Sequence, residues 1–136
     1  MEGPYGRLTA EVHDPARPVA LLAGGTGITP LRALLEDLDP ARTTVVHRVR
    51  TPADAVFAAE LHRLAGRVEH LVGPRAAPGS WLPAGAEPDA LVRLVPDIAA
   101  SEVYVCGPDG WVDAVRAAAR TAGVPDERIH TERFAW

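Results

Sequence analysis

A length of 136 residues fits one domain, and an apolar share of 47% with 24% charged residues is typical of globular proteins. The formal net charge of −4, with arginine as the only strongly basic residue type, excludes the basic surface of a nucleic-acid-binding protein. A single cysteine excludes an internal disulfide, and the lack of both a long unbroken apolar run and a signal peptide at Met1–Gly3 predicts a cytoplasmic domain without membrane contact of its own.

Short apolar or β-branched runs alternate along the chain with segments whose apolar residues recur at helical spacing. The pair Thr51-Pro52 predicts the start of one helix, because threonine caps helices and proline favours the first helical position. Residues 1–17 hold several glycines and prolines and form a tail or an edge element. The predicted elements in order are a strand at 19–23, a helix at 30–38, a strand at 43–49, a helix at 51–65, a strand at 68–72, a long loop at 73–87, a helix at 89–95, a strand at 102–106, a helix at 109–122 and a strand at 128–134.

This alternation predicts a three-layer α/β fold with a parallel sheet between helices. Right-handed crossovers favour the doubly wound, Rossmann-like strand order 3-2-1-4-5. The first and fourth strands are neighbours in that order, and ligands bind beyond the carboxyl ends of the strands where the winding direction reverses. We therefore expect the turns that follow 19–23 and 102–106 to lie side by side.

Both of these turns contain glycines and open a helix, which suits phosphate binding by free backbone N–H groups. The first departs from the G-x-G-x-x-G fingerprint because Pro30 replaces the third glycine; at the first helical position its missing N–H has no cost. Thr29 is expected to cap this helix or donate to a phosphate, and Arg32 to pair with a pyrophosphate. A tight strand–helix turn without a ligand is the alternative. The candidate cofactor-binding residues of the two turns are Gly24, Gly25, Thr26, Gly27, Ile28, Thr29, Pro30, Arg32, Cys106, Gly107, Pro108 and Asp109.

Three motifs in this order resemble the NAD(P)H-binding domain of the ferredoxin–NADP reductase superfamily. They are Gly25–Pro30, Cys106–Pro108 and the ending Glu132–Trp136, and the resemblance covers nearly the whole chain. Glu2–Gly6 looks like the segment that closes the family's flavin domain, and the stretch from Gly79 onward is similar to bacterial ferric-reductase-like members. The resemblance divides the chain into a remnant of the flavin-domain tail at 1–17 and an NAD(P)H-binding domain at 18–136.

The resemblance implies hydride transfer from NAD(P)H to FAD, followed by electron transfer to an acceptor that the sequence does not identify. It implies that Cys106 lies near the nicotinamide, that Glu132 sits at the flavin–nicotinamide contact and that Trp136 stacks on the flavin. The residues alone leave open core packing for Cys106, a solvated strand position for Glu132 and a frayed terminus for Trp136. The flavin-binding barrel is missing, so FAD would be held by another domain of the parent chain or by a separate subunit. Membrane segments outside this chain could tether the whole protein.

Cofactor choice depends on the end of the strand at 43–49. Arg48 and Arg50 alternate onto one side of that strand, and no acidic residue follows until Asp54. Arginine suits the 2′-phosphate of NADPH, whereas NAD sites usually offer an acidic residue to the ribose. The sequence therefore favours NADPH over NADH, with a solvated basic strand end as the alternative.

A nucleotide-sensing module without catalysis is the alternative function. A self-sufficient dehydrogenase with a Tyr-x-x-x-Lys set is excluded because lysine is absent. Trp111 is predicted to be core. No metal site is expected, since the histidines lack ligand spacing and are interpreted as surface or hydrogen-bonded residues: His13, His47, His62, His70 and His130.

Overall fold

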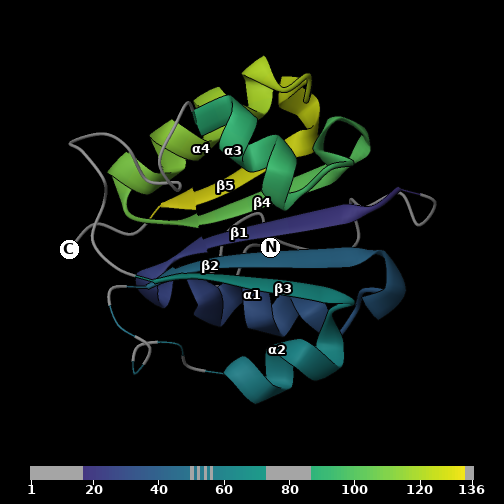
Figure 1. The fold of residues 1–136 in the computed structure, drawn as a ribbon, viewed down its shortest axis with the longest axis vertical. Coiled ribbons are helices and arrows are strands. Elements are labelled where there is room, and N and C mark those ends of the chain that lie inside the picture. The colour runs from purple at the N-terminus through teal and green to yellow at the C-terminus, as the bar shows by residue number, and fades with distance from the viewer. Residues whose placement is uncertain are drawn as a thin grey trace, which may run out of the picture.

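In the computed structural model, a parallel sheet of five strands lies between two layers of helices (Figure 1). The structure describes residues 17–49, 51, 53, 55, 57–72 and 87–133, with the backbone alone at 26 and 87–90. The strands are β1 (Val19–Gly24), β2 (Thr43–Val49), β3 (Arg67–Val72), β4 (Glu102–Gly107) and β5 (Ile129–Arg133). The α-helices are α1 (Ile28–Leu35), α2 (Ala58–Leu64), α3 (Glu87–Leu94) and α4 (Asp109–Thr121).

The strand order is β3-β2-β1-β4-β5, with every neighbouring pair parallel, which confirms the predicted doubly wound sheet. The register aligns one residue from each strand in a row near the carboxyl edge. This row consists of His70, His47, Ala23, Cys106 and Glu132.

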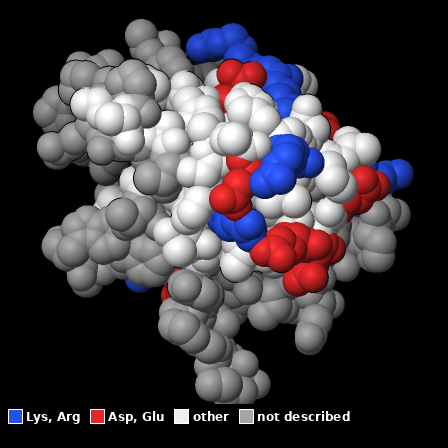
Figure 2. Space-filling model, turned by 90° about the horizontal axis from the view of Figure 1, so that it is seen from below, with Lys and Arg blue, Asp and Glu red and all other residues white. Residues whose placement is uncertain are grey.

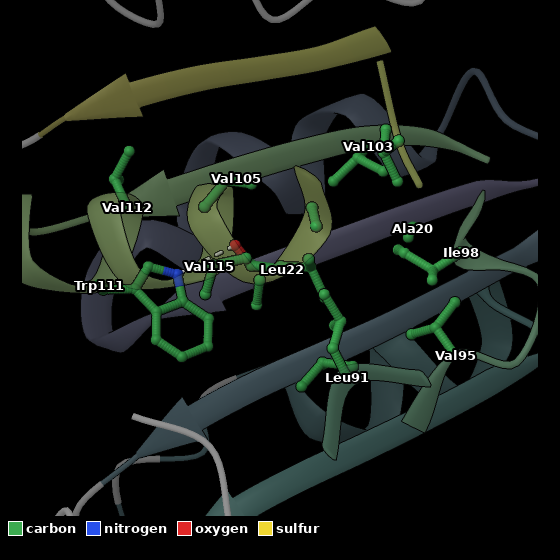
Figure 3. Close-up of a cluster of buried hydrophobic side chains, with 14 residues drawn as sticks. Ala20, Leu22, Leu91, Val95, Ile98, Val103, Val105, Trp111, Val112 and Val115 are labelled. Carbon is green, nitrogen blue, oxygen red and sulfur yellow. Dashed lines mark hydrogen bonds between the residues drawn. The ribbon is translucent and has the colours of Figure 1, made fainter. Parts of the chain in front are cut away.

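Alternation along the strands divides the core into two layers. In β1, Leu21 packs with α1 and α2 on one face, whereas Leu22 packs with α3 and α4 on the other (Figure 1). Trp111 of α4 is fully buried in the second layer, as predicted (Figure 3). Because β1 is buried on both faces, it reads in the sequence as a continuous apolar run.

Most predicted elements agree with the structure, but α2 begins at Ala58 rather than at Thr51. Its N-cap is Phe57, whose backbone is left-handed with φ 63°, and the Phe57 ring packs against the core below the sheet. The local Thr-Pro signal was overridden because the helix starts where Phe57 and the fully buried Leu61 reach that core. Position 52 lies outside the described residues.

The start of α1 also differs from the prediction. A short 3-10 helix, η2 (Gly25–Gly27), precedes it, and α1 begins at Ile28. Pro30 is therefore the third helical residue, where its missing N–H still has no partner to lose. Thr29 is not the N-cap, since Gly27 occupies that position without a side-chain hydrogen bond. No helix in the described ranges is long and apolar enough to cross a membrane.

Candidate nucleotide-binding site

The glycine turns after β1 and β4 contact each other at the carboxyl edge of the sheet. A Cβ placed on Gly27 would lie 2.2 Å from the carbonyl oxygen of Cys106. A Cβ placed on Gly107 would lie 3.1 Å from the carbonyl oxygen of Gly24. The two backbones therefore touch, which confirms the predicted juxtaposition of these turns.

The indole of Trp111 forms the floor beneath both turns. A Cβ on Gly24 would lie 2.8 Å from its Cγ, and one on Gly107 would lie 2.7 Å from its Cδ1. The indole N–H donates a hydrogen bond to the carbonyl oxygen of Leu22 at 3.2 Å (Figure 3). Glycine at positions 24 and 107 thus leaves room for a buried ring.

The glycines of the site have different physical roles, although the sequence predicted one shared role in phosphate binding. Gly24 and Gly107 accommodate Trp111, and Gly27 accommodates the Cys106 carbonyl. Gly25 alone faces open space: its φ is +58°, and no atom lies within 4 Å of a Cβ built there among the described residues. Gly25 is therefore the position at which the backbone is both exposed and unusually shaped.

The N-terminus of α1 supplies the groups that could hold an anion. The first N–H groups of η2 have no acceptor within a helix, because the i→i+3 bonds of a 3-10 helix begin only at its third residue, and the positive end of the helix dipole lies there. Ile28 and Pro30 are buried, whereas Thr29 is exposed. The turn therefore offers backbone N–H groups, rather than a set of charged side chains, to an anion.

Arg32 does not extend to this N-terminus as a free cation. Its Nε donates to Glu60 of α2 at 2.7 Å, and its Nη1 pairs with Glu36 one turn along α1. Figure 2, which views the side of α1 and α2, shows acidic side chains beside arginines on this face. The pair with Glu60 arises only from tertiary packing, so the sequence could not show it, and we leave Arg32 out of the proposed site.

The remaining predicted residues lie at the same sheet edge or outside the described residues. Arg48 is half-buried and in register with Gly24. Pro108 is half-buried, and Asp109, the first residue of α4, is exposed and accepts from Arg133 of β5 at 3.3 Å. The candidates that fall outside the description are Arg50, Trp136 and the side chain of Thr26.

Cys106 and Glu132 are in register on adjacent strands and lie on the α1 side of the sheet. Cys106 is fully buried, and burial, with a smaller contribution from the charge of Glu132, raises the pKa of its thiol to about 12. Glu132 Oε1 is buried and has no hydrogen-bond partner within the described part of the chain. The arrangement offers a small apolar wall beside a carboxylate, and it does not activate the thiol as a nucleophile.

We expect Cys106 to resist alkylation in the folded protein. A thiol with a pKa of about 12 holds roughly a thousandth of the thiolate of a free cysteine near pH 8, so iodoacetamide should react at least about a hundred times more slowly than with glutathione. Mass spectrometry measures the alkylation rate of Cys106 in the folded protein, without denaturant, and in the unfolded protein, with denaturant. Folding raises the pKa of this thiol above its value in the unfolded chain. Its contribution to the free energy of unfolding is therefore fully present below the unfolded-state pKa and is lost as the pH rises toward 12. Equal rates in both states would show an accessible, activated thiol.

Sequence reasoning missed two side chains that support the first glycine turn, Trp111 and His47. His47 is fully buried and hydrogen-bonds the carbonyl of Gly25, whereas His130 pairs with Glu102 at 2.5 Å. No spacing rule connects a histidine in β2 with a glycine 22 residues earlier, so nothing in the pattern could have identified it. Across the described residues, no three His, Cys, Asp or Glu side chains come together as a group that could hold a metal ion.

Comparisons with known proteins agree with this geometry. Residues 21–117 match the family described as oxidoreductase NAD-binding domain. The glycine betaine monooxygenase reductase subunit of Pseudomonas aeruginosa is 30% identical, over 98% of this chain and 39% of its own length. The ferredoxin–NAD(+) reductase component of the alkene monooxygenase system of Xanthobacter autotrophicus is 33% identical, over 98% of this chain and 44% of its own length.

Among solved structures, the flavohem-like FAD/NAD-binding domain of nitric oxide dioxygenase from Vibrio cholerae superposes with a TM-score of 0.70 at 25% identity, over 98% of this chain and 55% of that one. The chain spans about two fifths of the length of these two curated relatives. The match over residues 21–117, the strand order and the paired glycine turns lead to one conclusion: the chain belongs to the oxidoreductase NAD-binding domain family.

Proposed function

We propose that this chain is the pyridine-nucleotide-binding part of a flavin-dependent reductase, delivering hydride from NAD(P)H to FAD held by another domain. The observation that carries the proposal is the backbone contact between Gly27 and Cys106, which brings two helix-opening turns together at the switch point of the sheet. Relatives described as reductase components support the same reading. The proposed limits are a flavin-domain tail at 1–17 and the nucleotide-binding domain at 18–136.

The residues of the site have separate roles in this proposal. Backbone N–H groups at the start of α1, beside the exposed Gly25, hold the pyrophosphate. Cys106 serves as a small, un-ionised wall beside the nicotinamide, and Glu132 lies at the contact with the flavin domain. Trp136, which lies outside the described residues, is proposed to stack on the flavin until nicotinamide displaces it. FAD, when bound in its own domain, supplies the hydride acceptor, and this chain supplies binding and orientation.

The reductase proposal is tested by mixing the chain anaerobically with NADPH and a purified FAD domain from a reductase of this kind. Loss of the oxidised flavin absorbance, dependent on the chain, is the expected result. Flavin that stays oxidised while calorimetry shows bound nucleotide would instead favour the alternative, a nucleotide-sensing module without catalysis. The isolated chain with NADPH alone is the control and should not turn over.

We also propose that NADPH is preferred over NADH. Arg48 lies beside the first glycine turn, and Arg50 comes two residues later, so the alternation of side chains along a strand predicts the same side for both. Arg50→Glu should weaken NADPH binding by about tenfold or more, the value of one charge-assisted hydrogen bond, and leave NADH within about threefold. Calorimetric titration with both nucleotides measures this. Arg63→Glu, at an exposed position of α2, makes the same charge change as a control. Equal losses for the two nucleotides would refute the 2′-phosphate role.

A further inference from the structure

One buried histidine contacts the first glycine turn from the neighbouring strand. His47 of β2 is fully buried, and its Nε2 lies 2.8 Å from the carbonyl oxygen of Gly25. A carbonyl oxygen only accepts, so Nε2 carries the hydrogen and donates it. The bond joins residues 22 apart in the chain and therefore connects the turn to the body of the sheet.

The other imidazole nitrogen, Nδ1, indicates that the hydrogen bond to Gly25, rather than core packing, accounts for a histidine at position 47. Nδ1 of His47 is buried and has no hydrogen-bond partner among the described residues. An unpartnered buried polar atom destabilises a protein, so an apolar side chain would suit plain packing better at this position. Burial lowers the pKa of His47, with a smaller contribution from the charge of His70, whereas the hydrogen bond to the Gly25 carbonyl acts in the opposite direction.

Gly25 is the part of the turn that sterics leave unrestrained. Gly24 is wedged against Trp111 and Gly27 against Cys106, whereas no described atom lies within 4 Å of a Cβ on Gly25. Its φ of +58° is open to glycine together with many other values. Beyond the i→i+3 bonding of η2 itself, the hydrogen bond from His47 is the side-chain contact, among the described residues, that holds the Gly25–Thr26 peptide in one orientation.

That orientation determines where a donor points. The peptide bonds in the described chain are trans, so the Gly25 carbonyl and the Thr26 N–H point in opposite directions. With the carbonyl held toward the imidazole, the Thr26 N–H points away from it. This N–H belongs to the start of η2, where it has no acceptor within the helix.

We propose that His47 is a positioning residue for the nucleotide loop: by holding the Gly25 carbonyl, it orients the Thr26 amide toward the pyrophosphate of a bound dinucleotide before binding occurs. The inference rests on the proposed function and names how that same site is preorganised. A loop that is ordered in advance loses less conformational entropy when the ligand binds, and this gain appears as affinity.

The test uses the full chain with variants that separate the donor from the ring. His47→Phe keeps a ring without the donor, and His47→Gln places an amide N–H close to the position of Nε2. His47→Asn is a second loss variant, because its amide nitrogen takes the place of Nδ1 and does not reach Gly25. His70→Phe is the matched control, since His70 contacts the His47 ring and makes no bond to Gly25.

Calorimetry with ADP-ribose, which carries the pyrophosphate without nicotinamide, measures the effect. His47→Phe and His47→Asn should bind about tenfold more weakly, His47→Gln should return to within about threefold of the original affinity, and His70→Phe should change it less than about twofold. Rescue by glutamine distinguishes positioning from a loss of core packing, and thermal melting of each variant reports the packing. Nitrogen-15 NMR of the original chain should show a protonated Nε2 and an unprotonated Nδ1, with the Thr26 amide resonance moved in the loss variants.

The outcomes separate the two proposals. If the original chain binds ADP-ribose and the folded loss variants bind it equally well, the positioning role is overturned and the proposed function stands. A protonated Nδ1 with a bare Nε2 overturns the role even if no variant folds. If the original chain binds neither ADP-ribose nor NADPH, the proposed function itself fails.

Discussion

Gly27→Ala is expected to abolish nucleotide binding and to lower the free energy of unfolding by about 3 kcal/mol, the upper range for overpacking a tight contact. The added Cβ would lie 2.2 Å from the oxygen and 2.6 Å from the carbon of the Cys106 carbonyl. These are backbone atoms of β4, which is paired with β1, so no flexible side chain can move aside. The turns would be forced apart. Denaturant unfolding and titration with NADPH measure the two effects.

Gly25→Ala is the matched control in the same turn. Open space surrounds that position among the described residues, so the methyl group meets no atom and the change is limited to the strain of a positive φ, about 1 kcal/mol. We therefore expect Gly27→Ala to be the more damaging variant by about 2 kcal/mol. Equal stability of the two variants would show that the turns after β1 and β4 are not in backbone contact.

Trp111→Ala is the second change with a large expected effect, about 3–5 kcal/mol of lost unfolding free energy, as for other fully buried tryptophans. A domain of this kind is stable by only about 5–15 kcal/mol, so this loss is a large fraction of the total. The variant should also weaken nucleotide binding, because the floor beneath Gly24 and Gly107 is removed. Thermal unfolding and titration with NADPH check both.

A double-mutant cycle separates the contact with Trp111 from general loss of stability. Gly24→Ala alone places a Cβ 2.8 Å from the indole and should destabilise the chain, whereas in the Trp111→Ala background the same methyl group enters the vacated space. The two losses should be less than additive by about 1–3 kcal/mol, the range for residues in direct contact. Additive losses would contradict the placement of the indole under the turn.

Prediction from the sequence succeeded where the signal was local and periodic. The apolar run of β1 and the helical spacing of α4 each report burial of a whole element, and right-handed crossovers then leave the observed strand order. The start of α2 shows the limit of local signals. Thr51-Pro52 is a sound helix start in isolation, but Phe57 and Leu61 determine where the helix can reach the core.

The candidate site shows the same difference between local and long-range signals. The meeting of the two glycine turns was predictable, because turns after two strands converge wherever those strands are neighbours in a doubly wound sheet. The contacts of the individual turn residues were not predictable, because the sequence does not show that folding brings Glu60 of α2 within 2.7 Å of Arg32. The structure likewise replaces the one role predicted for all the glycines with three: contact with Trp111, contact with the Cys106 carbonyl, and exposure to open space at Gly25.

The amino-acid sequence by itself determined the class of fold, the order of the strands and the edge of the sheet at which the two glycine turns meet, since periodicity and turn chemistry act between residues close in the chain. Only the tertiary structure decided what each turn residue contacts. The bond from His47 to Gly25 and the indole beneath Gly24 join residues 22 and 87 positions apart, and such contacts depend on strand register and helix packing that no short segment encodes.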